Sequence, residues 1–144
     1  MDFRKETRGL RNNNPGNIRH GNSWKGEIMG KDSAFETFEF VEWGIRAIYV
    51  TLNTYRTKYK CTTVEQIINR WAPPVENNTK NYVNGVLKYI SACSSRAARE
   101  CAEDGGKLDV FATELVDELV AAIIFYESGF NPFNMEFIQS CKAL

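Results

Sequence analysis

The sequence predicts a mainly helical protein, a single domain over residues 1–144, with one small β-hairpin near the N-terminus. Three observations carry this prediction. The length of 144 residues suits one domain. Beyond residue 41, apolar residues recur at the three- and four-residue steps of helices. Before that point the chain is rich in Asn and Gly, and its aromatic residues alternate imperfectly with polar ones over residues 35–40.

The first part of the chain is expected to be loop followed by hairpin. Residues 8–24 read RGLRNNNPGNIRHGNSW, and Asn and Gly tolerate left-handed backbone while Pro15-Gly16 is a turn dipeptide. Residues 24–40 contain short segments divided by Gly26 and Gly30, with Phe35 and Phe38 on the candidate strands. We expect a small hairpin or extended pair there.

The remaining elements are expected to be helices. Residues 41–59 form the first, with Trp43 in its apolar stripe and therefore in the core. Thr63 caps a helix over 64–70 that Pro73-Pro74 ends, and Asn78 or Thr79 caps the next. Residues 91–107 form a loop or broken helix. The longest helix is expected over 108–127, closed by Gly129, and Asn134 caps a last one over 135–143.

Composition limits the function classes. Eighteen basic and eighteen acidic residues cancel, so no nucleic-acid partner is expected. Residues 1–11 lack the apolar core of a secretory signal, and residues 115–125 are too short to span a bilayer. We therefore expect synthesis in the cytoplasm without membrane insertion.

The cysteines and the histidine limit cofactors. The chain has four cysteines, no CxxC pair and one histidine, His20, so neither a metal nor another cofactor is expected. A Cys93–Cys101 disulfide and reduced, buried cysteines are both open readings.

Glu127 is the candidate catalytic residue. It lies at the end of an apolar stripe through Val120 and Ile123, at a helix C-terminus among aromatic residues, with no basic residue between 108 and 139. These surroundings disfavour an ionised carboxylate. A carboxyl that keeps its proton suits glycosidic bond cleavage, because the leaving oxygen must be protonated.

Two resemblances agree with this chemistry. The segment IIFYESGFNP (123–132) resembles the catalytic segment of lytic transglycosylases and related lysozyme-like enzymes, which implies that Glu127 is the general acid and base; their later Gly-Ala-x-Gly-Leu-x-Gln phrase is absent. The phrases RNNNPGNIR, WKG, FETFEFVEWGIRA and RWAPPVENNTKNY, in this order, resemble phage-encoded cell-wall hydrolases and bacterial glucosaminidases. In those glucosaminidases the Glu-Ser helix precedes the Asn-Asn phrase, so we hypothesise a circularly permuted lysozyme-like fold.

The expected activity is cleavage of peptidoglycan glycan strands, by a muramidase, lytic transglycosylase or N-acetylglucosaminidase. Flat aromatic rings and amides bind sugars. The candidate substrate-binding residues are Asn14, Asn17, Trp24, Trp71, Asn78, Tyr82 and Tyr126. Trp71 is equally well interpreted as core. A second carboxylate is Glu27 or Glu76, although Glu76 fits a first-turn helix acid better.

Three alternatives stay open. A virion or wall-binding protein without catalysis would keep the fold, and a cysteine amidase would need a cysteine near His20. An interbacterial toxin, rather than a phage lysin, would have a dedicated inhibitor protein. A protein that acts on the wall from the cytoplasm requires delivery by a virion, a holin or a contact-dependent injector.

Overall fold

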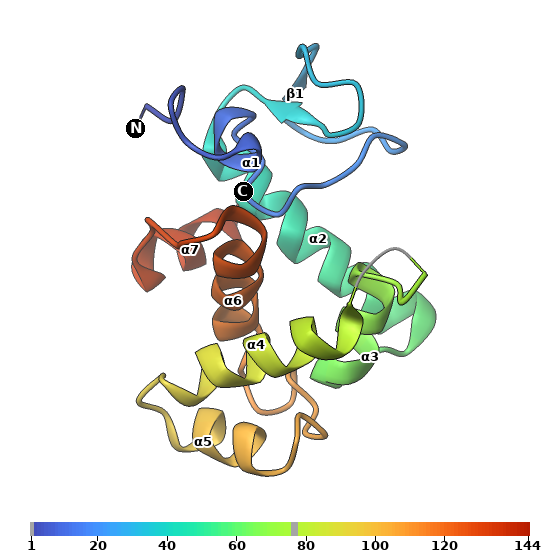
Figure 1. The fold of residues 1–144 in the computed structure, drawn as a ribbon, viewed down its shortest axis with the longest axis vertical. Helices are drawn as coiled ribbons and strands as arrows, with labels where there is room; N and C mark the ends of the chain where they lie inside the picture. The colour runs from blue at the N-terminus through green and yellow to red at the C-terminus, as the bar shows by residue number, and fades with distance from the viewer. Residues whose placement is uncertain (1, 76–77) are drawn as a thin grey trace. The chain divides into compact units, whose positions relative to one another are not determined.

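The computed structural model describes residues 2–75 and 78–144, which contain seven helices and one two-stranded antiparallel sheet (Figure 1). The mainly helical class with a hairpin near the N-terminus is confirmed. The helices and strands, in chain order, are α1 (Arg8–Arg11), β1 (Glu27–Ile28), β2 (Thr37–Phe38), α2 (Val41–Tyr59), α3 (Val64–Trp71), α4 (Thr79–Ser91), α5 (Arg96–Glu103), α6 (Val116–Ser128) and α7 (Met135–Cys141).

The chain divides into two compact units. Unit 1 comprises Met1–Thr51 together with Ile123–Leu144, and unit 2 comprises Leu52–Ala122. The boundary falls within α2 and within α6, so each of these helices has residues in both units. The expectation of one lysozyme-like domain over residues 1–144 stays a prediction.

Unit 1 is built around the hairpin and the first turns of α2. Strand β1 pairs with β2 in the register Glu27 with Phe38 and Ile28 with Thr37. Phe38 is buried together with Leu10 of α1 and with Ile45 and Ile48 of α2. Residues 8–11 were expected to be loop, but they form the single helical turn α1, too short a segment to show a helical period.

The two ends of the chain both pack into unit 1. The ring of Phe3 meets that of Phe133 edge-on, with 5.8 Å between centroids, and Phe133 stacks on Phe137 of α7. The Arg46 guanidinium of α2 donates to the carbonyl oxygen of Leu144 at 3.0 Å. Asn134 caps α7 as expected, because its side chain accepts from the backbone N–H of Phe137.

Unit 2 shows the helix signals that its sequence predicts. Thr63 and Gln66 form a reciprocal capping box at the start of α3. Of the two candidate caps for α4, Asn78 is the N-cap, and its side chain accepts from the N–H of Asn81. Of the loop or broken helix expected over residues 91–107, the structure shows a helix, α5, capped by Ser95. The core of this unit includes Ile67, Ile68, Val86 and Ile90.

The long helix expected over residues 108–127 is wrong in its first half, because α6 begins only at Val116. The carboxylate of Asp109 accepts hydrogen bonds from the backbone N–H groups of Phe111 and Ala112, at 2.8 and 2.9 Å. Such a side chain offers the backbone an alternative to helical bonding. Glu114 then adopts a left-handed backbone, φ 59°, which ends this turn before the helix starts.

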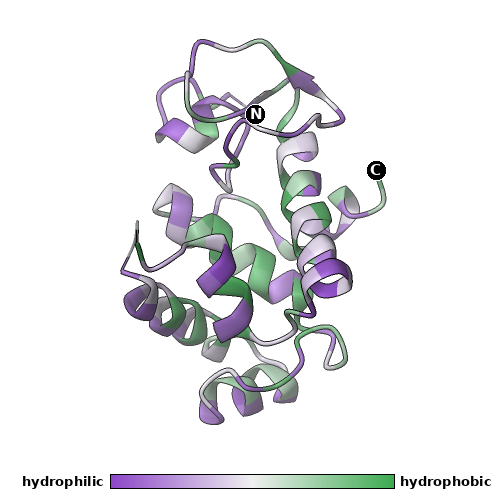
Figure 2. Cartoon of the chain, turned by 90° about the vertical axis from the view of Figure 1, so that its right-hand side faces the viewer, coloured by the Kyte–Doolittle hydropathy of each residue, from purple (hydrophilic) through white to green (hydrophobic). Residues whose placement is uncertain are grey.

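The helix α6 is apolar around most of its circumference. Every residue from Leu119 to Ile124 is buried, across both units. In Figure 2 the helices carry both hydrophobic and hydrophilic positions, whereas the N-terminal loops are largely hydrophilic. Gly129 follows α6 with φ 84°, the left-handed cap that the sequence predicts. No helix among residues 2–75 and 78–144 is long and apolar enough to cross a membrane.

Candidate functional site

Glu127 occupies the last turn of α6 in unit 1, and it is half-buried. The buried residues Ile123 and Ile124 precede it on the same helix, so packing fixes the helix end that carries the carboxyl. Three exposed aromatic side chains lie near it in sequence, Phe125, Tyr126 and Phe130, with exposures of 45%, 43% and 38%. The carboxyl therefore sits at a partly open surface with aromatic neighbours in the chain.

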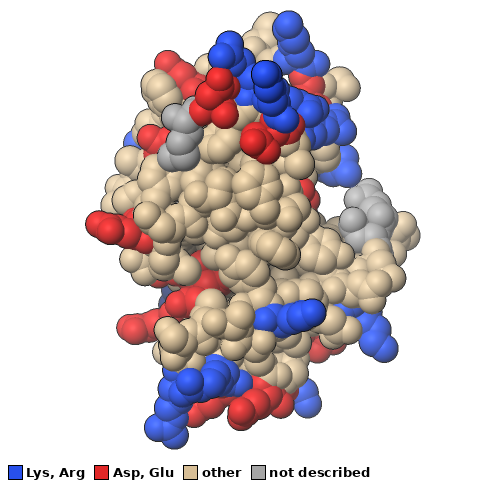
Figure 3. All heavy atoms as spheres, turned by 60° about the vertical axis from the view of Figure 1, so that its left-hand side comes forward, with Lys and Arg blue, Asp and Glu red and all other residues tan. Residues whose placement is uncertain are grey.

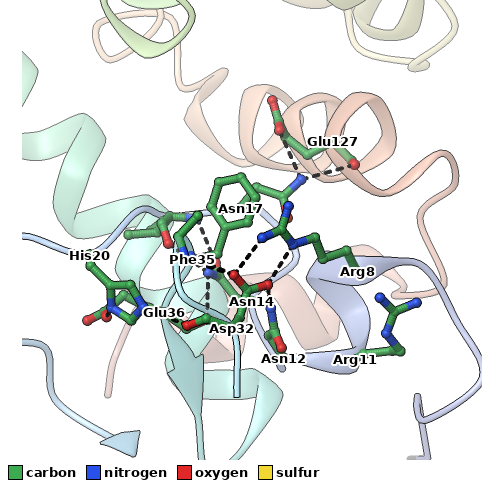
Figure 4. Close-up of polar contacts among 12 residues, drawn as sticks. Arg8, Arg11, Asn12, Asn14, Asn17, His20, Asp32, Phe35, Glu36 and Glu127 are labelled. Carbon is green, nitrogen blue, oxygen red and sulfur yellow. Dashed lines mark hydrogen bonds and ion pairs between the residues drawn. The ribbon is translucent and has the colours of Figure 1, made fainter. Parts of the chain in front are cut away.

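The asparagine-rich loop contacts this helix end directly. The Nδ2 of Asn17 donates to the carboxylate Oε1 of Glu127 at 3.2 Å and to its backbone carbonyl at 3.3 Å (Figure 4). Next to it, the buried Ser128 hydroxyl donates to the Pro15 carbonyl at 2.9 Å, and the Thr7 hydroxyl donates to the Ser128 carbonyl at 3.1 Å. The two segments that the sequence singled out thus meet in unit 1.

The loop reaches Glu127 because its backbone turns sharply at two asparagines. Asn13 and Asn17 both adopt left-handed backbone, with φ of 52° and 51°. Gly9 leaves room for the turn, because a Cβ there would lie 2.7 Å from both the Asn14 carbonyl oxygen and the Asn17 Oδ1. The Asn–Gly composition of residues 8–24 therefore serves the geometry around Glu127.

Asn14, a predicted substrate-binding residue, is enclosed by the loop and the hairpin. Its side chain has 0% exposure. Its Oδ1 accepts from the Ile18 N–H, and its Nδ2 donates to the carbonyls of Ile18 and Glu36, each at 2.9 Å. A carboxamide occupied in this way presents no atom to a sugar, so Asn14 holds the loop against the hairpin.

A second cluster of charges lies between α1 and the hairpin. The Asp32 carboxylate binds the Arg8 guanidinium with two contacts of 2.6 Å and accepts from Asn12 at 3.0 Å. It also accepts from the backbone N–H groups of Ala34 and Phe35. The Arg8 guanidinium holds the pKa of Asp32 well below its usual range. The arrangement anchors the segment between β1 and β2 to α1.

His20 and Glu36 form a contact that the sequence did not reveal. His20 Nδ1 meets Glu36 Oε1, and His20 Nε2 lies 3.0 Å from the carbonyl oxygen of Asp32. Glu36 is 4% exposed. Burial raises its pKa, and the neighbouring carboxyl of Glu27 adds to this rise. The same interaction with Glu36 lowers the pKa of Glu27. Unit 1 thus holds two carboxyls whose pKa values are pushed apart.

Trp24 and Tyr126 are the aromatic candidates in unit 1. Tyr126 is exposed, as a sugar-binding ring must be. Trp24 is half-buried, and its Nε1 is buried without a hydrogen-bond partner among the described residues. The expected core residue Trp43 is only partly buried; it packs against Gly26, where a Cβ would lie 2.2 Å from its ring, and Lys25 lies over its face.

Three further candidates belong to unit 2. Tyr82 is 3% exposed, so its ring is part of the core, and this burial does not favour the substrate-binding role predicted for it. Trp71 is half-buried at the end of α3. Asn78 caps α4 and borders a groove of about 720 Å³ that also has Asn69 and Asn84 in its lining. Glu76 lies outside the described residues.

Three of the four cysteines have a raised pKa, which does not favour a nucleophilic role for them. All four are free thiols, including Cys93 and Cys101, and Cys101 and Cys141 are buried. Burial raises the pKa of Cys93 and Cys101, and it raises that of Cys141 to about 11. Within residues 2–75 and 78–144, no three His, Cys, Asp or Glu side chains are grouped so that they could hold a metal ion.

Comparison with known proteins places the chain in a family. No family model matches it. The chain is 36% identical over 137 residues to Protein P5 of Pseudoalteromonas phage PM2, and the match covers 92% of this chain and 78% of that protein. The chain belongs to the phage PM2 protein P5 family. The expectation of a phage protein agrees with this membership of the P5 family. On the face shown in Figure 3, basic and acidic side chains lie next to one another, as the balanced composition predicts.

Proposed function

We propose that this member of the P5 family cleaves the glycan strands of peptidoglycan, with Glu127 as general acid and base. The observation that carries the proposal is the hydrogen bond from Asn17 to the Glu127 carboxylate. It joins the two segments that separately resemble lysozyme-like enzymes, the Glu-Ser helix end and the Asn-Asn phrase. Both segments belong to unit 1, and this also supports a circularly permuted lysozyme-like arrangement.

Glu127 would first give its proton to the glycosidic oxygen as the bond to the sugar breaks. It would then act as base, either toward water, which gives hydrolysis, or toward the 6-hydroxyl of the same sugar, which gives an anhydro product. A single carboxyl suffices when the substrate's own acetamido group stabilises the reacting carbon. Where two carboxyls act, Glu27 is the candidate for the second, since it is exposed on β1 and its pKa is lowered.

Asn17 is the residue that positions this carboxyl. It was expected to bind substrate, but its Nδ2 already donates to Glu127 Oε1 and to the Glu127 carbonyl. One amide group thereby links the side chain to its own helix end and limits its rotation. Such fixed geometry contributes strongly to rate, because a displacement of about 1 Å can cost about 100-fold.

Mass spectrometry of the fragments released from purified cell-wall sacculi tests the proposal. We expect the protein to release glycan fragments, whose ends distinguish the bond and the reaction: reducing N-acetylmuramic acid, reducing N-acetylglucosamine, or anhydro-sugar. Glu127→Gln keeps the shape of the side chain and should abolish release. Glu136→Gln, an exposed change in the first turn of α7, is the matched control and should leave release unchanged.

Two results would reject this function. Undiminished release by Glu127→Gln would remove that residue from the chemistry. Binding to sacculi without release of any fragment would instead identify a wall-binding protein without catalysis. Release of free stem peptides would indicate an amidase, for which Cys→Ser variants provide the check.

The role of Asn17 has its own test. Asn17→Gly keeps a residue that accepts the φ of 51° and removes the carboxamide. We expect the cleavage rate to fall by about tenfold to 100-fold while binding to sacculi is retained. Weakened binding with an unchanged maximal rate would show that Asn17 contacts the substrate instead.

A further inference from the structure

His20 and Glu36 are not used by the proposed chemistry, in which Glu27 is only the candidate second carboxyl, yet the cluster of these three residues contains the most deeply buried acid of unit 1. Only 4% of Glu36 is exposed, and its Oε2 is buried with no hydrogen-bond partner among the described residues. An ionised carboxylate with one unpaired buried oxygen is costly. A proton shared with the neighbouring Glu27 carboxyl would satisfy that oxygen.

His20 supplies the positive charge for these two acids. Its Nε2–H donates to the carbonyl of Asp32, which leaves Nδ1 to face Glu36. The nearby Asp32 carboxylate is paired with Arg8, and its charge adds to the rise in the pKa of His20. The Asp32 carbonyl bond raises the pKa of His20, and Glu36 raises it further.

The same residues connect the hairpin to the loop that holds Glu127. The Glu36 N–H donates to the Ile18 carbonyl at 2.9 Å, and the His20 N–H donates to the Ala34 carbonyl at 3.1 Å. Asn17, which bonds Glu127, directly precedes Ile18 in the chain. Loss of the His20–Glu36 pair would therefore loosen the loop immediately after the residue that positions the carboxyl.

We propose that His20, Glu36 and Glu27 form a proton-sharing cluster that fixes the asparagine-rich loop against the hairpin and releases it as the pH rises. Its effect on cleavage depends on the proposed function; its effect on the loop does not.

The direction of the pH effect follows from linkage. A group whose pKa is higher in the folded than in the unfolded protein contributes stability at low pH and loses it as the pH rises through the folded value. His20 and Glu36 are both of this kind. Glu27 has a lowered pKa, so its contribution is lost only as the pH falls below the ordinary glutamate range. The loss therefore begins above the ordinary pKa of each group, about 4.3 for Glu36 and about 6.5 for His20, and it is complete above the folded values.

A nuclear magnetic resonance titration tests the cluster directly, because the chain has a single histidine and hence one imidazole signal. We expect its midpoint above 6.5, and a lower midpoint in Glu36→Gln. Glu39→Gln, an exposed change in the same segment, is the matched control and should leave the midpoint unchanged. An equal midpoint in the protein and in Glu36→Gln would overturn the proposal.

Hydrogen exchange, corrected for the intrinsic effect of pH, measures the release of the loop. Protection of the Glu36 and His20 backbone amides should fall, by at most about tenfold per unit of pH, between about 6.5 and the His20 midpoint and should level off above it, and protection of unit 2 amides should not follow it. If Glu36→Gln does not fold, the exposed change His20→Gln replaces it, and protection should then be independent of pH from 6 to 9. Protection that is independent of pH in the unaltered protein would overturn the proposal. Neither measurement needs a substrate. Both can therefore support the cluster even if the protein releases no fragments from sacculi.

Discussion

Replacement of Asn14 by alanine distinguishes a structural role from a substrate-binding role most sharply. The substitution removes three buried hydrogen bonds, to the Ile18 N–H, the Ile18 carbonyl and the Glu36 carbonyl. The Ile18 carbonyl keeps a second partner, the Glu36 N–H. The Ile18 N–H and the Glu36 carbonyl lose their side-chain partner inside a buried region.

The expected cost can be worked from these partners. A buried polar group left without a partner costs about 1–3 kcal/mol, so two such groups and one lost bond correspond to about 3–5 kcal/mol. That is a large part of the stability of a typical domain, about 5–15 kcal/mol. In urea, with a slope of about 2 kcal/mol per molar, the unfolding midpoint should fall by about 2 M.

Urea unfolding followed by circular dichroism measures this cost, with Asn22→Ala as the control. Asn22 is exposed in the loop that follows, so its replacement should change stability by less than about 0.5 kcal/mol. A loss below about 1 kcal/mol for Asn14→Ala, together with weakened binding to sacculi, would refute the reasoning and restore the substrate-binding role.

Three further perturbations test other parts of the structure. Gly44→Ala should destabilise the protein despite the better helix propensity of alanine, because the new Cβ would lie 2.0 Å from the Asn13 carbonyl oxygen. Urea unfolding measures the change in stability, and a gain would contradict the prediction. Because Arg8 lowers the pKa of Asp32, the Arg8–Asp32 pair stabilises the fold at neutral pH, and this stabilisation is lost as the pH falls below about 3.9. In Asp32→Asn the free energy of unfolding should therefore fall less steeply at acid pH. The Cys141 thiol, buried and with a pKa of about 11, should resist a thiol reagent at pH 8 until the protein unfolds, and rapid labelling in the native state would oppose this.

Local signals in the sequence were sufficient for most helix ends. The caps Thr63, Asn78 and Asn134 and the left-handed Gly129 all lie where residue type predicts them. Each of these features depends on side chains within four residues of the helix end, so no tertiary information is needed. The prediction for the start of α6 was wrong because Asp109 forms a local turn in a segment whose apolar spacing is still that of a helix.

The candidate site was less predictable, because burial depends on contacts between distant residues. Asn14 and Asn17 look alike in sequence, yet one is enclosed by the hairpin and the other reaches Glu127. The contact between His20 and Glu36 joins residues 16 apart whose spacing matches no motif. Tyr82 was expected in a cleft although its position in the apolar period of α4 already favoured the core.

Unit 1 is built from two separate stretches of the chain, and this limits the order in which the protein can fold during synthesis. Asn17 and Glu127 are 110 residues apart, and the whole of unit 2 is translated between them. Unit 2 is a continuous segment, so it can begin to fold while the ribosome is still at work, whereas the first unit has to wait for the residues after Ala122. The Glu127 carboxyl therefore acquires its asparagine partner only after the whole of unit 2 has been translated, and a product that stops before Glu127 would lack the assembled site.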